Sequence, residues 1–245
     1  MRHLLFSLLL LPAVGPALAP ETILLADFNN KPLDQPIGTG GAAAGEPVQL
    51  STLIETRVRA APAGGRELEL SKEPSFGTAN IRFEFLELEE VTTGQMRFSV
   101  ALRLGTADQF SRVGLLLRER PGAAQAFLNL NLFSDGDAQI SRSGFPVERF
   151  ENALALSALN LVEILFDLDD KTFSLCLNGE VLALALDAGI ETTRGIGSVL
   201  ISLPAEGDTL VWLDEIDVKK GNFGDGGSDT VFADRFDNAP PTCPF

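Results

Sequence analysis

The chain has 245 residues, of which 45% are apolar, and its formal charge at pH 7 is −15. This length and composition are sufficient for one large hydrophobic core in a single domain. The strong negative charge argues against nucleic acid and anionic membrane surfaces as partners, because both would repel the protein.

The first nineteen residues have the pattern of a secretory signal peptide. Arg2 and His3 form a short basic region, residues 4–11 are an apolar run, and Ala17-Leu18-Ala19 is a small-residue cleavage site. Later apolar segments are too short or too interrupted for a membrane helix. We therefore expect an exported bacterial protein, secreted or periplasmic, that is monomeric and does not insert into a membrane.

Short segments of alternating apolar and polar residues follow the signal at regular spacing, as is typical of strands packed on a core by one face. The expected strands cover residues 23–28, 55–60, 66–71, 79–88, 95–104, 113–120, 125–133, 138–143, 195–203 and 209–218, with three more between 161 and 187. Residues 29–48 form a long loop rich in glycine, proline and alanine, and residues 151–160 are ambiguous between helix and strand. The sequence thus predicts an all-β protein, a two-sheet antiparallel β-sandwich (jelly roll) over residues 20–219.

The stretch 161–187 has the clearest pattern, that of three short strands joined by two tight turns. Val162, Ile164 and Phe166 alternate with their neighbours in the first strand, and Phe173 and Leu175 do so in the second. The turns are expected at residues 169–171 and at the Asn-Gly pair 178–179, a dipeptide that accepts positive φ readily.

Residues 220–245 form a Gly/Asp-rich linker followed by a proline-rich tail, and this region contains one of the two cysteines. Cys176 lies within an expected strand, and Cys243 lies near the end of the tail. Two cysteines in an exported protein can form a disulfide, which here would join the tail to the sandwich. Alternatively, Cys176 is a small buried hydrophobic residue and Cys243 is a free or intermolecular thiol.

Four pieces of the sequence, in this order, resemble the concanavalin A-like lectin/glucanase superfamily in its laminin-G-like jelly-roll branch. They are LLADFN, FSDGDAQI, LVEILFDLDDKTFSLCLNG and WLDEIDV, and the resemblance covers roughly residues 22 to 219. It implies a fold whose members range from sugar-binding modules to glycosidases and adhesive domains, so the fold does not choose among these functions. The segment VFADRFD is similar to a C-terminal segment of the form IFADGFE in exported proteins of some gammaproteobacteria, with Arg235 where that pattern has glycine.

Two expected strands carry polar side chains on the side opposite their apolar residues. Arg97 and Arg103 lie on one of these strands, and Asn129 and Asn131 lie on the other. If both strands share one sheet, these four residues form a ligand-binding surface that could hydrogen-bond a polyol or an acidic glycan. The alternative is a solvated sheet face. Trp212 is expected in the core, because it alternates in phase with apolar residues of the last strand.

The residues available for catalysis are limited. His3 is the only histidine and leaves with the signal, and the chain has no tyrosine, so Ser-His-Asp catalysis and histidine-containing metal sites are excluded. Residues 215–219 resemble the E-x-D-x-E motif of the superfamily's retaining glucanases, but Lys219 stands where that motif has its acid/base glutamate.

Three functions therefore remain, in order of preference. The first is a secreted, non-catalytic binding or surface-interaction domain whose partner is a glycan or a cell-surface component. The second is a structural module of an envelope or matrix, and the third is a carboxylate-dependent glycoside hydrolase.

A structural calcium ion is the one cofactor that we expect. The alternation places the carboxylate of Asp214 on the apolar side of its strand, where an unpartnered charge would cost several kcal/mol. The resemblance implies that the first and last strands lie side by side and often hold a structural Ca²⁺ near their ends. Asp27 and Asp214 are the expected ligands, with Asn29 as a third, since calcium prefers oxygen donors. Alternatively, Asp214 accepts backbone N–H bonds and no metal binds.

Overall fold

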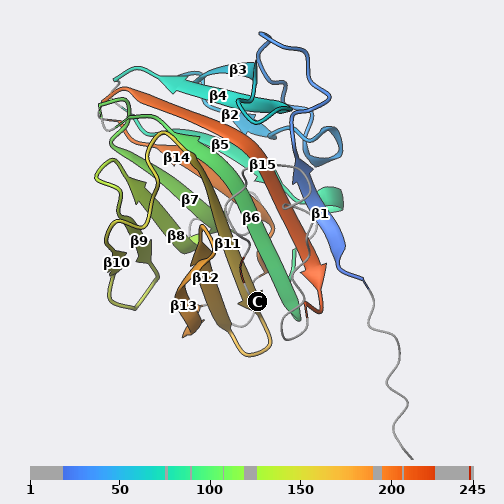
Figure 1. Ribbon diagram of the computed structural model, residues 1–245. Helices are drawn as coiled ribbons and strands as arrows, with labels where there is room; N and C mark the ends of the chain where they lie inside the picture. Colours follow the sequence, from blue (N-terminus) through green and yellow to red (C-terminus); the bar gives the residue numbers. More distant parts are fainter. Residues whose placement is uncertain are drawn as a thin grey trace, which may run out of the picture.

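The computed structural model describes residues 19–74, 77–88, 90–106, 108–118, 126–189, 195–205, 207–223 and 243, and the structural statements below concern these. Of the described residues, 54% are in strands and 3% in helices, and two antiparallel sheets pack face to face (Figure 1). This confirms the predicted β-sandwich. The signal peptide, the DGGSD linker and the VFADRFD segment lie outside the described residues. Within the described residues, no helix is long and apolar enough to cross a membrane.

The first sheet has eight strands and contains the longest strand of the molecule. Its strands are β1 (Glu21–Ala26), β3 (Glu55–Ala60), β4 (Arg66–Lys72), β6 (Gln95–Leu104), β11 (Leu159–Asp167), β12 (Thr172–Leu177), β13 (Glu180–Asp187) and β15 (Thr209–Gly221). They are arranged in the order β13-β12-β11-β6-β15-β4-β3, and β1 pairs with the far half of β15. β15 therefore contacts three strands along its length, and the first and last strands lie side by side as the resemblance implies.

The second sheet has seven strands and lies behind the first in Figure 1. Its strands are β2 (Gln49–Leu50), β5 (Ala79–Glu84), β7 (Arg112–Arg118), β8 (Ala126–Phe133), β9 (Ala138–Ser141), β10 (Glu148–Phe150) and β14 (Ser198–Leu203). They are arranged in the order β10-β9-β8-β7-β14-β5-β2.

The core lies between the sheets and is formed by the alternate residues that the sequence predicted. Val162, Ile164 and Phe166 of β11 are buried in it, together with Phe173 and Leu175 of β12. The Asn-Gly pair 178–179 has the expected positive φ values, 52° and 82°, and in the turn at residues 169–171 residue 171 also has a positive φ, 55°. The stretch 161–187 is thus the predicted run of three strands.

The structure differs from the predicted strands in three places. Residues 151–158 form neither a helix nor a strand, and β11 begins at Leu159. β5 ends at Glu84 and is followed by a 3-10 turn at Leu86–Leu88, where the alternation predicted further strand. β2 and β10, of two and three residues, were not predicted because such short strands show no periodicity.

A β-bulge in β15 reverses the alternation of this strand. In the pairing with β6, Leu213 lies opposite Leu102 and Glu215 lies opposite Ala101, so Asp214 is an extra residue in β15. The core-facing residues of β15 are Val211 and Leu213 before the bulge, and Ile216 and Val218 after it.

Because of the bulge, the expectation that Trp212 lies in the core is wrong. Trp212 precedes the bulge and is half-buried on the outer face of the eight-stranded sheet, away from the core cluster. A period-two pattern carried through Asp214 assigns every residue of the first half of the strand to the wrong face.

Candidate functional site

The four polar residues expected to share a ligand-binding surface do not lie together. Arg97 and Arg103 are on β6 of the eight-stranded sheet, whereas Asn129 and Asn131 are on β8 of the seven-stranded sheet. Each pair does face outward, since the residues that alternate with them are in the core. The strands belong to opposite layers of the sandwich, so the expected common surface is wrong and two separate faces must be considered.

The outer face of the seven-stranded sheet carries an uncharged polar row that includes Asn131. Strand pairing aligns its members directly opposite one another across β9, β8, β7, β14 and β5. The row consists of Gln139, Asn131, Gly114, Ser202 and Asn80. Position 114 has no side chain, but it is closely surrounded: an added Cβ would lie 3.2 Å from the Cδ1 of Leu116, 3.4 Å from the Cβ of Ser202 and 3.5 Å from the Oδ1 of Asn131. The amides and hydroxyls of the row provide donors and acceptors together, as a sugar hydroxyl requires.

The neighbouring row includes Asn129 and continues this surface. It consists of Ser141, Asn129, Leu116, Leu200, Arg82 and Gln49. The Oδ1 of Asn129 and the Nε of Arg82 are buried atoms without a hydrogen-bond partner among the described residues. Buried polar atoms in this state are uncommon and are often completed by a ligand or by water.

A pocket of about 410 Å³ lies at one end of this face. It is lined by Thr78, Ser111, Arg112, Phe133, Pro204 and Ala205. Arg112 and Phe133 lie opposite each other in the pairing of β7 with β8, two residues along each strand from Gly114 and Asn131 and on the same face. The pocket and the rows therefore form one continuous surface, which we call the amide face.

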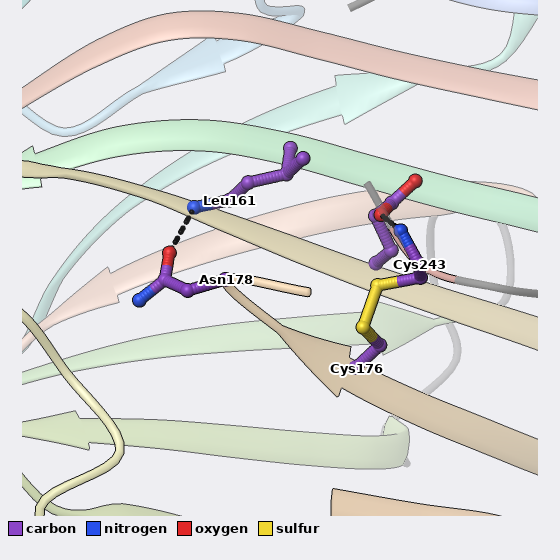
Figure 2. Close-up of a disulfide and its surroundings, with 5 residues drawn as sticks. Leu161, Cys176, Asn178 and Cys243 are labelled. Carbon is purple, nitrogen blue, oxygen red and sulfur yellow. Dashed lines mark hydrogen bonds between the residues drawn. A yellow bond between two sulfur atoms is a disulfide. The ribbon is translucent and has the colours of Figure 1, made fainter. Parts of the chain in front are cut away.

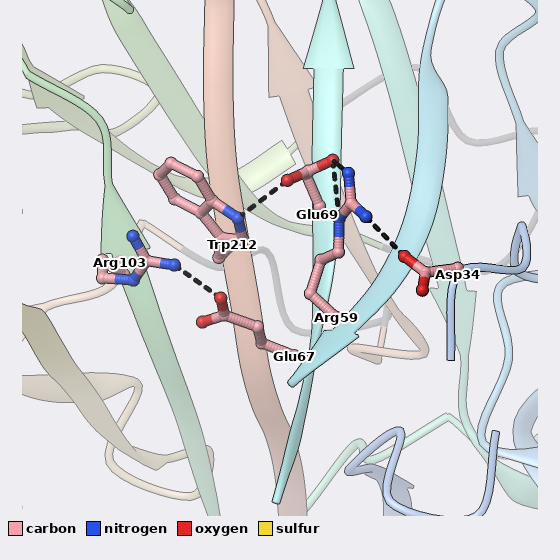
Figure 3. A network of polar contacts seen from close by, with 6 residues as sticks. All are labelled: Asp34, Arg59, Glu67, Glu69, Arg103 and Trp212. Atoms are coloured by element: carbon pink, nitrogen blue, oxygen red, sulfur yellow. Dashed lines mark hydrogen bonds and ion pairs between the residues drawn. The ribbon is translucent and has the colours of Figure 1, made fainter. Parts of the chain in front are cut away.

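The outer face of the eight-stranded sheet has a different character, that of a closed ionic network (Figure 3). The guanidinium carbon of Arg103 lies 3.7 Å from the ring centroid of Trp212, and Arg103 also forms an ion pair with Glu67. The indole N–H of Trp212 donates to Glu69, and Glu69 is also paired with Arg59. These groups pair with one another, although the Nε of Arg103 is a buried atom without a hydrogen-bond partner among the described residues, and we interpret the network as structural.

This interpretation gives a prediction about Arg103. Replacing it by alanine leaves Glu67, which is 3% exposed, as a buried carboxylate without its cation. Arg103→Ala should therefore lower the free energy of unfolding by about 2 kcal/mol, and the emission of Trp212, the only tryptophan, should shift to longer wavelength. Arg57→Ala, which removes an exposed arginine from the same sheet, is the control and should change neither quantity. Unchanged stability in Arg103→Ala would contradict the assignment.

The segment that resembles a glucanase motif lies on this same outer face. Glu215 and Asp217 are 2% and 5% exposed, and the Nζ of Lys219 lies 3.4 Å from the Oδ2 of Asp217. The position of the motif's acid/base glutamate is thus occupied by an ammonium group that pairs with a motif carboxylate. This arrangement lacks the second carboxylic acid that glycoside hydrolysis needs at that position.

The three residues expected to bind calcium line one pocket of the structure. Asp27, Asn29 and Asp214 line a pocket of about 360 Å³, together with Glu215 and residues 63–65. The bulge makes this possible, because an extra residue re-aims its side chain away from the regular pleat. Asn29 is the weakest candidate, since its Oδ1 already accepts the backbone N–H of Arg66 at 2.9 Å. Sequence analysis did not identify Glu215, because its contribution depends on the bulge.

Asp214 is the most perturbed group of this pocket. It is 6% exposed and forms no hydrogen bond or ion pair with another described residue. Burial, followed by repulsion from Glu67, Glu215 and Asp27, raises the pKa of Asp214 to about 7. The expected backbone N–H donors to Asp214 are not found among the described residues, and a buried carboxylate in this state suits a hard cation such as Ca²⁺. The carboxylates of Asp27, Asp214 and Glu215 line the same pocket, but they do not form a cluster with all their ligand atoms within 4.8 Å of one another.

A disulfide joins Cys176 of β12 to Cys243 (Figure 2). The backbone N–H of Cys243 donates to the Oε2 of Glu163 at 2.8 Å, and burial raises the pKa of Glu163. Phe223, which follows β15, packs under the guanidinium of Arg97 on the same outer face. The tail is thus attached to the eight-stranded sheet at both described points, and β15 extends to Gly221, two residues beyond the expected domain boundary.

Comparisons with known proteins define the fold more clearly than the activity. No family model matches the sequence, and no curated protein matches it. A solved carbohydrate esterase, vb_24B_21 from the Shiga toxin-encoding bacteriophage phi24B, is similar over 83% of this chain and 100% of its own, with a TM-score of 0.55 and 10% identity. Cellulose induced protein Cip1 is similar over 80% of this chain and 96% of its own, with a TM-score of 0.52 and 17% identity.

Other similar structures are larger than this chain. The binding domain of botulinum neurotoxin serotype D has a TM-score of 0.52 and 10% identity, and the match covers 82% of this chain and 48% of that one. The chain spans only 17% of a sialidase with a TM-score of 0.48. At these identities the comparisons show the fold alone, a β-sandwich that also occurs in carbohydrate-related proteins.

Proposed function

We propose that this chain is an exported, non-catalytic domain that binds a glycan through the amide face of its seven-stranded sheet. The observation that carries the proposal is the aligned row of amide and hydroxyl side chains around Gly114. Such a row can exchange hydrogen bonds with several sugar hydroxyls at once, and its members are held in place by strand pairing, so little side-chain entropy is lost on binding. The occurrence of a similar β-sandwich in a phage carbohydrate esterase supports this choice.

The proposal extends to a structural calcium ion near the ends of β1 and β15. Asp27, Asp214 and Glu215 would supply carboxylate oxygens, with Asn29 as a weaker donor. The ion would neutralise the charge of Asp214 and fasten the first strand to the last. We propose that the ion stabilises the fold and takes no part in glycan binding. The pocket lies at the bulge of the eight-stranded sheet, away from the amide face.

A glycan array probed with the mature protein at millimolar calcium tests the binding function. We expect Asn131→Ala to weaken binding of the best ligand about tenfold, because a hydrogen bond lost at a buried polar site costs about 1 kcal/mol or more. Gly114→Gln should also weaken it, because a side chain at position 114 would displace the neighbouring side chains of Ser202 and Asn131. Arg57→Ala, on the opposite sheet, should bind as the wild type does. Absence of any ligand on the array, or a ligand that binds all variants equally, would contradict the proposal.

A further inference from the structure

The charges of the amide face have the opposite sign to those of the whole protein. Outward-facing positions on β5, β7, β8 and β14 carry three arginines and one glutamate, although the chain has a net charge of −15. The arginines are Arg82, Arg112 and Arg118, and the glutamate is Glu84. Glu84 lies 3.5 Å from the guanidinium of Arg82, which compensates that arginine in part. A locally basic surface on an acidic protein attracts anions selectively.

Arg112 is the best placed of these arginines for binding. It is exposed, and it forms no hydrogen bond or ion pair with any residue that the structure describes. It is also the only charged residue among the six that line the pocket at the end of the amide face. The nearby cation of Arg149 is already engaged, because it forms ion pairs with Asp135 and Asp137, at 2.6 Å in each case.

The pocket also supplies an apolar surface beside this charge. Phe133, half-buried, lies opposite Arg112 in the strand pairing, and the guanidinium carbon of Arg149 lies 5.5 Å from the centroid of its ring. The volume of about 410 Å³ is within the range of small-ligand sites. An aromatic ring next to a free guanidinium matches a sugar ring that carries an anionic group, because the ring packs against C–H bonds and the guanidinium binds the anion through two parallel N–H donors.

We infer that the glycan bound by the amide face is acidic, and that Arg112 binds the carboxylate or sulfate of a terminal sugar unit in the pocket beside Phe133. This inference rests on the proposed glycan-binding function and narrows its ligand class. The remaining units of the glycan would then lie along the row that contains Asn131 and Gly114.

The test compares charged and uncharged forms of the same sugars. Hexamers of galacturonate, mannuronate and glucuronate, their fully methyl-esterified forms and a sulfated hexasaccharide are titrated calorimetrically at low salt. At least one acidic form should bind about tenfold or more tightly than its uncharged counterpart, as expected for a charge-assisted pair. Arg112→Gln should remove this preference and leave binding of the uncharged form unchanged. Arg57→Gln, which removes the same charge from the opposite sheet, should leave the preference intact.

The outcomes separate the inference from the function on which it rests. Equal binding of acidic and esterified hexamers, or glycan binding confined to neutral sugars, overturns the acidic ligand and leaves the glycan-binding function in place. A preference that persists in Arg112→Gln overturns the assignment of the pocket. Tighter binding of the sulfated hexamer identifies sulfate, and tighter binding of a uronate identifies carboxylate, as the group held by Arg112. Failure of every glycan to bind overturns the function and the inference together.

Discussion

Without divalent cations, the protein is expected to lose about 2 to 4 kcal/mol of unfolding free energy between pH 4 and pH 7 through Asp214. The pKa of Asp214 rises from 3.8 to about 7 on folding, so the folded protein holds this proton more tightly than the unfolded chain does. The resulting stabilisation is fully present below the unfolded pKa and is lost as the pH rises through the folded pKa. Asp214→Asn cannot ionise and should therefore be more stable than the wild type at pH 8.

Other carboxylates also titrate over this range, so the measurement must isolate Asp214. Burial raises the pKa of Glu67 and Glu163, while hydrogen bonds lower the pKa of Asp137. Urea unfolding at several pH values, in chelator, gives the difference between the wild type and Asp214→Asn, from which the shared contributions cancel. Asp208→Asn removes an exposed carboxylate just before β15 and is the matched control. A constant difference between pH 4 and pH 8 would contradict the buried, ionisable state of Asp214.

Calcium should reverse this loss if the proposed ion binds. A cation that binds only the folded protein stabilises it by about 2.7 kcal/mol when its concentration is one hundred times the dissociation constant. The melting temperature of the wild type at pH 8 should therefore rise with calcium, and that of Asp214→Asn should respond far less. An equal response to calcium and chelator in both proteins would exclude the calcium site and leave the pH prediction standing.

Loss of the disulfide should lower the free energy of unfolding by about as much as ionisation of Asp214 does. Cys176 and Cys243 are separated by 67 residues, and a crosslink over this length removes conformational entropy from the unfolded chain worth about 4 kcal/mol. In urea unfolding, the double variant Cys176→Ser, Cys243→Ser should show a free energy of unfolding that is lower by most of this amount.

Reduction of the wild type provides the matched comparison for the disulfide. In the presence of a dithiol, the wild type and the double variant should have the same free energy of unfolding, whereas in oxidising buffer they should differ. A difference below about 1 kcal/mol in oxidising buffer would show that the tail adds little to stability, as a dispensable appendage would.

The sheets could be predicted from the sequence because their residues face either core or solvent along most strands. Phe98 of β6, Leu130 of β8 and Ile164 of β11 are all in the core as the alternation predicts. Trp212 was misplaced because one inserted residue at Asp214 changes the phase, and the sequence carries no local signal of such a bulge.

The candidate site could be predicted only in part, since alternation identifies the face of a strand but not the sheet to which it belongs. Asn131 and Arg97 each face outward as expected, yet they lie on opposite layers of the sandwich. The amide face depends on which strands become neighbours, as in the pairing of Gly114 with Ser202, and these residues are far apart in the sequence. That Asp27 and Asp214 line one pocket could be expected, because the first and last strands of the resembled fold lie side by side.

The order of the strands also determines where two copies of the chain could join by main-chain pairing. Both edges of the seven-stranded sheet are very short strands, and edge strand β3 of the other sheet presents charged side chains, three of its six residues being glutamate or arginine. β13, at the opposite edge, has eight residues and exposes Val181 and Leu184 at 39% and 69%. A long edge with exposed aliphatic side chains is poorly protected against the addition of a further strand. Of these four edges, β13 is therefore where self-association or aggregation is expected to begin, and Leu184→Lys should suppress it.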